Sequence, residues 1–267
     1  MGAPVDAALA RHQAVSAVAL AILILIAWVW LLWGAGMGTT PQPSPMPGAG
    51  GVDPMAGMAM DAAAPSTAGR FVLTLAMWWV MMVAMMLPSA APTILLYARV
   101  ATAVPQSPRP ASGSFLAGYL AVWGSFALLA ALLQLQFERI GMITAGSLVL
   151  QSRMLSGAVL IAAGLYQLGP LKNACLRHCQ SPAQFLTRQY RPGPGGAFRM
   201  GLLHGAFCLG CCWLLMALLF VGGIMNLAWI ALLTTIVAAE KLLPFGRLVA
   251  RIGGGALLIW GATLMFA

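Results

Sequence analysis

The stretch Ala14-Val-Ser-Ala-Val-Ala-Leu-Ala-Ile-Leu-Ile-Leu-Ile-Ala-Trp-Val-Trp-Leu-Leu-Trp33 carries no charged residue. An α-helix needs about 20 predominantly apolar residues to cross a bilayer, and this run has that length. It lacks the small-residue cleavage site of a secretory signal peptide, so we expect it to remain as an N-terminal anchor span within residues 1–34. Across the chain 61% of residues are apolar and 7% are charged, whereas soluble domains carry about 25% charged residues. The sequence therefore predicts an all-α, polytopic bundle of transmembrane helices.

Apolar stretches recur along the rest of the chain, and only helices satisfy their own backbone hydrogen bonds across lipid at this length. We expect about seven spans, or six if one short stretch fails to cross. They lie at residues 14–34, 71–97, 114–136, 154–169, 199–222, 225–240 and 248–266. The fourth and sixth are short for a spanning helix. Gly222-Gly223 predicts a tight turn between the fifth and sixth spans.

Lysine and arginine residues predict the orientation, because cytoplasmic loops are enriched in them. With seven spans, one side of the membrane collects Arg11, Arg99, Arg109, Lys172, Arg177, Arg188, Arg191, Arg199, Lys241, Arg247 and Arg251. The other side holds Arg70, Arg139 and Arg153. The N-terminus is therefore predicted inside and the C-terminus outside. Since this topology accounts for the net charge of +9, we expect no nucleic-acid partner.

Residues 35–69, between the first two spans, are rich in Pro, Gly, Ala and Ser and show no periodic apolar face. This composition predicts a disordered external linker. The linker nevertheless contains Met55, Met58 and Met60, flanked by two aspartates. A disordered segment has no packing reason for methionines, whereas their thioethers are ligands for Cu(I). We therefore expect these three methionines to collect the ion outside the membrane.

All five cysteines fall in two clusters of the remaining membrane domain, residues 70–267. In the fifth span, His204, Cys208 and Cys212 are four residues apart and Cys211 follows Cys208 by three, so all four share one helical face. Thiolate and imidazole together are typical ligands of soft metal ions, Cu(I) above all. Polar groups within a membrane helix are costly and usually functional. The spacing predicts an intramembrane metal site.

Two other interpretations of this stripe stay open. Cysteine also packs as a small hydrophobic residue, and Gly201, Gly205 and Gly210 would let another helix approach closely. Cys208-Leu-Gly-Cys211 is in addition a C-x-x-C sequence, the spacing of redox and zinc sites.

The second cluster, Cys175-Leu-Arg-His178-Cys179, lies in the basic loop after the fourth span. Its C-x-x-H-C spacing matches neither zinc ribbons nor haem attachment. A reducing cytoplasm would keep its thiols free, and nearby cationic side chains would favour the thiolate form that binds metals. We expect Cys175, His178 and Cys179 to bind metal at the inner face. The alternative is a pair of membrane-surface cysteines, which can be palmitoylated.

Two further features have both a structural and a functional interpretation. Met81 and Met85 belong to a methionine stripe in the second span, which is either ordinary packing or a set of thioether ligands for Cu(I). Glu240 and Lys241 end the sixth span and suit a boundary pair whose charged groups reach the interface. In the alternative, Glu240 faces the cysteines as an oxygen ligand, a proton acceptor or a partner of His204.

A family resemblance rests on long and unusual motifs of the region from about residue 70 to 266. They are Met77-Trp-Trp-Val-Met-Met-Val-Ala-Met-Met-Leu-Pro-Ser-Ala-Ala-Pro92, Cys175-Leu-Arg-His-Cys-Gln-Ser-Pro182, Gly201-Leu-Leu-His-Gly-Ala-Phe-Cys-Leu-Gly-Cys-Cys-Trp213, Met225-Asn-Leu-Ala-Trp229 and Ala239-Glu-Lys-Leu-Leu-Pro244. With these, the chain resembles a bacterial family of predicted metal-binding integral membrane proteins, a domain of unknown function sometimes labelled copper chaperone. The resemblance implies a location in the bacterial inner membrane and supports metal binding at these motif positions.

The sequence thus predicts a membrane protein that binds Cu(I) and relays or delivers it, with no catalytic residues. No nucleotide motif such as a P-loop is present, which argues against an ATP-driven pump. The expected partners are the bilayer and a protein that donates or accepts copper, with a homo-oligomer or a larger membrane complex as further possibilities. Two alternatives are a membrane thiol-disulfide oxidoreductase and a non-catalytic assembly factor for a copper enzyme.

Overall fold

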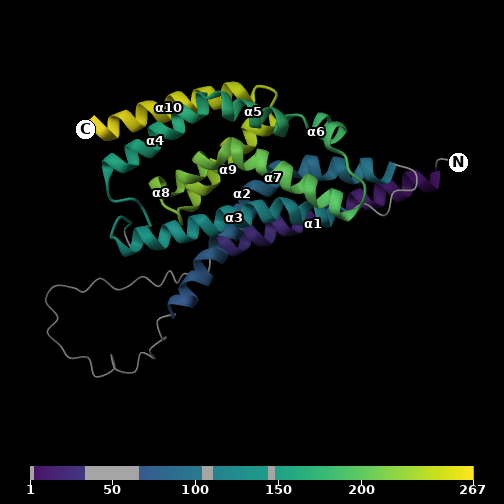
Figure 1. Cartoon of the computed structure of the whole chain (residues 1–267), viewed down its shortest axis with the longest axis horizontal. Helices are drawn as coiled ribbons and strands as arrows, with labels where there is room; N and C mark the ends of the chain where they lie inside the picture. The colour runs from purple at the N-terminus through teal and green to yellow at the C-terminus, as the bar shows by residue number, and fades with distance from the viewer. Residues whose placement is uncertain (1–2, 34–65, 104–110, 144–147, 267) are drawn as a thin grey trace.

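The computed structural model describes residues 3–33, 66–103, 111–143 and 148–266 (Figure 1). These residues form ten helices and no strand. In chain order they are α1 (Ala3–Leu32), α2 (Thr67–Ala103), α3 (Ser112–Arg139), α4 (Arg153–Leu168), α5 (Pro170–Gln180), α6 (Pro182–Gln189), α7 (Gly193–Ala217), α8 (Leu219–Gly222), α9 (Leu227–Leu242) and α10 (Gly246–Phe266). The predicted all-α fold is confirmed for this part of the chain.

A helix occupies each of the seven predicted span positions, although not every one is long enough to cross a membrane alone. Five helical stretches are long and apolar enough: Gln13–Leu32, Thr67–Ala101, Ser112–Arg139, Gly193–Gly222 and Gly246–Phe266. The α4 and α5 pair, bent by 61°, would make a sixth. Helix α9 has 16 residues, which gives about 24 Å against a hydrocarbon core of about 30 Å. The described residues thus contain five to six candidate spans.

The predicted linker lies almost wholly outside the described residues, and with it Met55, Met58 and Met60. Helix α2 begins at Thr67, within the last residues of the segment predicted as linker.

The segment after the fourth span is helical, which corrects the predicted loop. Gly169 separates α4 from α5, and Pro170 and Pro182 occupy the first turns of α5 and α6. Proline suits this position because its missing N–H would have no partner there and its φ is already helical. The cluster from Cys175 to Cys179 is therefore carried on a helix, which fixes the directions of its side chains.

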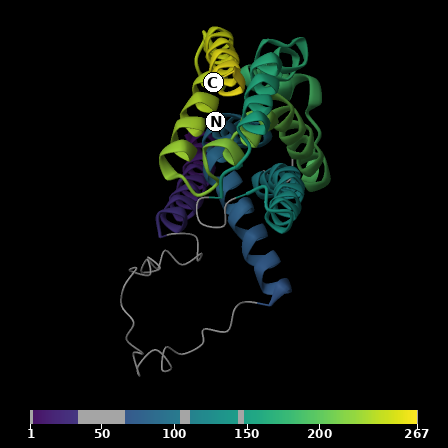
Figure 2. The ribbon, with the colours of Figure 1, turned by 90° about the vertical axis from the view of Figure 1, so that its left-hand side faces the viewer.

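Helix α7 lies in the middle of the bundle and contacts α3, α4, α5, α8 and α9. Figure 1 shows α4 and α10 side by side along one edge, while α1 packs along α2 on the opposite side of α7. The N-terminal end of α2 extends beyond the other helices (Figure 2). Side chains of α7 therefore meet several different helices.

Two glycines bring α3 and α7 into close contact. A Cβ at Gly118 would overlap the carbonyl oxygen of Phe198, and one at Gly201 would overlap that of Phe115. Small residues at such positions let helix backbones approach closely. This contact fixes how α7 is rotated, and so which neighbours its cysteines face. At the other end of α7, Gly223 has a φ of 97° and forms the predicted tight turn before α9.

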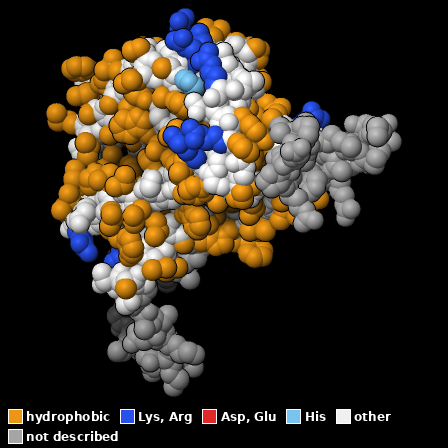
Figure 3. Space-filling model, turned by 45° about the vertical axis from the view of Figure 1, so that its right-hand side comes forward, with side chains coloured by type: hydrophobic (Ala, Val, Ile, Leu, Met, Phe, Trp, Pro, Cys, Tyr) orange, Lys and Arg blue, Asp and Glu red, His pale blue; other side chains and the backbone are white. Residues whose placement is uncertain are grey.

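The outside of the bundle is strongly apolar. Large hydrophobic side chains are exposed on several helices, including Leu25, Leu129 and Ile259. Figure 3 shows one face of the molecule, where hydrophobic side chains cover most of the surface and are interrupted by patches of Lys and Arg. Soluble proteins rarely expose such continuous apolar surface. Several helices therefore suit insertion into a membrane.

Candidate metal centre

The four soft side chains of α7 are all buried, as the stripe predicted. His204 is 2% exposed and Cys208, Cys211 and Cys212 are each 1% exposed. The thiols of Cys211 and Cys212 both donate to the carbonyl oxygen of Cys208, at 3.1 and 2.9 Å. Beyond these bonds the side chains diverge, because α7 is surrounded by several helices. Side chains of this stripe therefore contact two separate groups of residues on the surrounding helices.

Cys208 contacts a lysine from α9. The Nζ of Lys241 lies 2.9 Å from the Sγ of Cys208 and 3.9 Å from the Sγ of Cys212. The same Nζ lies 3.9 Å from the Sδ of Met86 and 3.3 Å from the Oγ of Ser89, both on α2. One buried position is thus surrounded by three sulfur atoms from two helices, and the ammonium group of a third helix occupies it.

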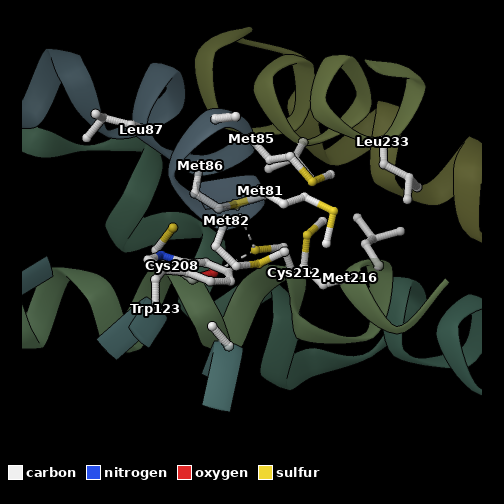
Figure 4. Packing of buried hydrophobic residues seen from close by; sticks show 14 of the residues in the cluster. Met81, Met82, Met85, Met86, Leu87, Trp123, Cys208, Cys212, Met216 and Leu233 are labelled. Atoms are coloured by element: carbon white, nitrogen blue, oxygen red, sulfur yellow. Dashed lines mark hydrogen bonds between the residues drawn. The ribbon is translucent and has the colours of Figure 1, made fainter. Parts of the chain in front are cut away.

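The methionine stripe of α2 faces this group. Met81 and Met85 are buried, and Figure 4 shows them across from Cys208, Cys212 and α7 residue Met216. The thioether in direct contact with a thiol belongs to another residue, since the Sδ of Met86 lies 3.7 Å from the Sγ of Cys212. The thioether contact with Cys212 is therefore made by Met86, which lies outside the predicted stripe of Met81 and Met85.

Two hydroxyl groups hold the α2 side of this group in place. The Oη of Tyr119 on α3 lies 3.1 Å from the Sγ of Cys208 and donates to the carbonyl oxygen of Met86, also at 3.1 Å. Ser89 donates to the same carbonyl at 2.9 Å. Tyr119 is fully buried. It links α2, α3 and α7 at the cysteine whose sulfur contacts Lys241.

The second cysteine cluster packs against the other face of α7. Cys179 on α5 lies next to Cys211 on α7, close enough for their thiols to interact. The Sγ of Cys175 lies over Gly210, where an added Cβ would be only 2.8 Å from the sulfur. The structure therefore brings Cys175, Cys179 and Cys211 to a single interface between α5 and α7.

His178 also contacts α7, but apart from these cysteines. Its ring is exposed and stacks on Phe207, with ring centroids 4.1 Å apart and planes inclined by 5°. Its Nδ1 lies 3.0 Å from the carbonyl oxygen of Ala174 in its own helix. The residue predicted as part of the inner metal cluster thus lies at its outer edge.

His204 lies in an aromatic pocket. Its ring is 5.4 Å from that of Phe185, 5.8 Å from Tyr119 and 6.1 Å from Phe115, measured between centroids. The Nδ1 atom is buried and has no hydrogen-bond partner in the protein. A buried polar atom without a partner is costly and needs an explanation such as an ion or a water molecule. This unpaired nitrogen supports the prediction that His204 serves a ligand.

Glu240 has a role that neither predicted interpretation describes. It is fully buried, and its Oε2 accepts from the Nζ of Lys172 at 2.5 Å while its Oε1 accepts from Gln167 at 2.7 Å. Lys172 also donates to Gln167. The interpretation of Glu240 and Lys241 as a boundary pair is wrong, because both side chains are buried. Glu240 joins α9 to α4 and α5, and no hydrogen bond connects it to His204.

Within the described residues, no group of three or more His, Cys, Asp or Glu side chains is arranged as a ready-made metal site. The group around Lys241 contains two cysteines and one methionine, so it is not counted among such sites. The sequence prediction left out Lys241, Lys172, Tyr119 and Met86. The sequence did contain a signal for two of them: Lys172 and Lys241 each lie near a cysteine cluster or at the end of an apolar span. They were instead interpreted as charges of the inner membrane surface.

The comparisons with known proteins identify the family of this chain. A family model, PpoB2, described as a copper chaperone, matches residues 75–264. The chain belongs to the PpoB2 copper chaperone family. No curated protein and no solved structure matches the chain.

The PpoB2 match confirms the predicted resemblance and limits where it applies. It begins within α2 and ends within α10, so it includes the methionine stripe and both cysteine clusters. Helix α1 and the methionine-containing linker precede it. The description of the family implies that the chain handles copper.

Proposed function

We propose that this protein binds Cu(I) within the bacterial inner membrane, through Cys208, Cys212 and Met86. One observation carries the proposal: a single atom, the Nζ of Lys241, lies within 3.9 Å of all three sulfur atoms. Three sulfurs around one small buried position make a soft site of the kind that suits Cu(I). His204, with its unpaired Nδ1, lies one turn earlier on α7 and is a further candidate ligand.

The second face of α7 suits the role of acceptor. Cys211 directly precedes Cys212 in the chain and lies next to Cys179, with Cys175 close by. In our proposal the ion moves from the Cys208 and Cys212 group to these thiols by exchange of sulfur ligands. His178, at the exposed end, would then lie where a partner protein receives the copper.

The proposed route begins outside the membrane. Met55, Met58 and Met60 would collect the ion, and Met81 and Met85 would pass it along α2 to Met86. Thioethers bind Cu(I) more weakly than thiolates do, so the order along this route favours uptake or delivery over export. The expected partner is a protein that donates or accepts copper, such as the copper enzyme that this chain would help to assemble.

We propose seven crossings, with the N-terminus in the cytoplasm. Helix α1 begins and α10 ends at opposite ends of the bundle (Figure 1), as an odd number of crossings requires. Two of the basic residues assigned to the inner loops, Lys172 and Lys241, are in fact buried. The remaining basic residues still favour the same side, so the argument from charge is unchanged. The short helix α9 would cross where the bundle itself surrounds it.

The direct test is Cu(I) content after purification in detergent under reducing conditions. We expect the wild type to hold stoichiometric Cu(I) against a competing chelator, and a variant with all five cysteines changed to serine to lose it. Met154→Leu is the matched control, because it removes an exposed methionine of α4. A wild type that binds no Cu(I), or a cysteine-free variant that binds it equally well, would contradict the proposal.

A thiol-disulfide oxidoreductase is the second candidate, and the contact between Cys179 and Cys211 favours it. In that role a membrane quinone would take two electrons and two protons from the two thiols as they form a disulfide, and a substrate dithiol would reduce the disulfide again. Mass-tagging of free thiols in cells separates the two candidates: a copper site keeps all five thiols reduced, whereas an oxidoreductase shows a trapped Cys179–Cys211 disulfide.

A further inference from the structure

Lys241 lies inside the proposed copper site with no carboxylate partner. Its side chain is 5% exposed, and its Nζ contacts two thiols, a thioether and the hydroxyl of Ser89. The neighbouring Glu240 is already paired, because both of its carboxylate oxygens accept from Lys172 and Gln167. The positive charge of Lys241 therefore depends on the sulfur ligands for its balance.

The buried charges of the bundle can be counted. Among the described residues, the buried Lys, Arg, Asp and Glu side chains are Lys172, Glu240 and Lys241. The first two form an ion pair and cancel. One positive charge is left beside Cys208 and Cys212. An uncompensated charge is costly in an interior of low dielectric constant. The affinity of the site for a metal ion therefore depends on the summed charge of that ion, the two thiolates and the ammonium group.

We infer that Lys241, whose ammonium group moves aside when an ion enters but stays next to the thiolates, makes the Cys208, Cys212 and Met86 site selective for monovalent over divalent soft metal ions. Two thiolates and a monovalent ion carry a net charge of −1, which the ammonium group cancels. Two thiolates and a divalent ion are neutral, which leaves the ammonium group uncompensated. Both ions displace the same two thiol protons, so this contribution cancels in the comparison.

Ligand softness alone does not make such a site discriminate between Cu(I) and Zn²⁺. Thiolates bind Zn²⁺ as well as Cu(I), and the common order of affinities does not by itself separate them. Lys241 is close enough to both sulfurs for the sign of its charge to matter, since charge interactions fall with distance and grow in an apolar interior. Lys241 acts here through the charge balance and is not a ligand. The inference rests on the proposed copper site.

The experiment measures selectivity in the full-length protein, purified in detergent under anaerobic, reducing conditions. Dissociation constants for Cu(I) and Zn²⁺ are obtained by competition with chelators, for the wild type and for Lys241→Leu, which removes the charge without adding a sulfur ligand. We expect Zn²⁺ binding to gain on Cu(I) binding by about tenfold or more in the variant, because the charge next to the thiolates is gone. Arg247→Leu is the matched control: it removes an exposed positive charge six residues along the chain and should leave the ratio unchanged.

The outcomes separate this inference from the copper site itself. A wild type that binds neither ion contradicts the copper site. A Lys241→Leu variant that loses affinity for both ions equally shows a structural role and overturns the inference, as does an unchanged ratio. If Lys241→Leu does not fold, the wild type is tested with Ag(I) and Cd²⁺, two soft ions of different charge. Preference for Ag(I) supports the inference, and equal or tighter binding of Cd²⁺ at these cysteines overturns it.

Discussion

The two faces of α7 carry cysteines from one short sequence, and they have different surroundings. Towards α2 and α9, Cys208 and Cys212 lie next to a thioether and a buried ammonium group. Towards α5, Cys211 meets the thiol of Cys179. The first face offers a closed site for one cation, and the second a thiol interface near the basic end of the bundle. Residues that share a helical stripe can therefore belong to two steps of one process.

The ion pair between Lys172 and Glu240 connects the two faces, because it joins α5 to α9. Lys172→Met would leave the carboxylate of Glu240 buried without its charged partner. Removing one partner of a buried ion pair costs about 3–5 kcal/mol of stability, and both side chains here are at most 1% exposed. We expect a loss of this size in SDS-induced unfolding of the detergent-solubilised protein.

The control for this prediction is the double variant Lys172→Met with Glu240→Gln, which removes both charges. It should regain most of the lost stability, since no unpaired charge remains. An equally unstable double variant would show that packing, rather than charge pairing, explains the effect.

The cysteines of the two faces should differ in their effect on copper affinity. Cys208→Ser with Cys212→Ser removes both thiolates of the closed site, so Cu(I) affinity should fall by about a thousandfold. Cys175→Ser with Cys179→Ser is the matched pair on the other face and should leave equilibrium affinity within about tenfold while slowing transfer to an acceptor. Chelator competition measures the affinities. Equal losses in the two pairs would argue for a single shared site.

The rotation of α7 relative to its neighbours depends on its close contact with α3. Gly201→Ala places a methyl group against the carbonyl oxygen of Phe115, and overpacking of this kind costs about 1–3 kcal/mol. Gly255→Ala in α10 is the control, because nothing lies within 4 Å of the added Cβ. SDS-induced unfolding should show destabilisation only in the first variant. A neutral Gly201→Ala would mean that α3 and α7 can separate without cost.

The smallest expected effect on Cu(I) affinity comes from removing a tyrosine hydroxyl, and each face of α7 has one tyrosine that can be changed. Tyr119→Phe removes the hydroxyl that contacts Cys208, and a lost hydrogen bond of this kind costs about 0.5–1.5 kcal/mol, or up to about tenfold in Cu(I) affinity. Tyr166→Phe removes a hydroxyl that donates to the carbonyl oxygen of Gly210 beside Cys175. Copper affinity of this control should match the wild type. Equal effects of both variants would contradict the separation of the two faces.

Much of the fold follows from the sequence because apolar runs and glycine turns are local signals. They place helices at all seven expected positions and the turn at Gly223. The number of crossings does not follow in the same way, since α9 and the bent α4 and α5 pair lie near the length limit. Pro170 and Pro182 resemble loop residues in a sequence, yet each begins a helix.

Some residues of the candidate site likewise follow from local sequence spacing, whereas others depend on how the helices pack. Spacing alone placed His204, Cys208, Cys211 and Cys212 on one buried helix. Which sulfur of α2 meets Cys212 depends on how α2 is rotated against α7, so Met86 could not be distinguished from Met81 and Met85 by pattern. A lysine at the end of an apolar helix normally reaches the interface. The burial of Lys241 depends on the thiols and the hydroxyl group that surround it.

X-ray absorption at the copper edge tests the central claim most directly, on purified protein loaded with one equivalent of Cu(I). We predict coordination dominated by sulfur in the wild type and in the Cys175→Ser, Cys179→Ser variant. In the Cys208→Ser, Cys212→Ser variant, washed with a chelator that the wild type resists, the bound copper and its sulfur signal should be lost. An unchanged sulfur signal in that variant, or coordination by nitrogen and oxygen alone in the wild type, would contradict the account.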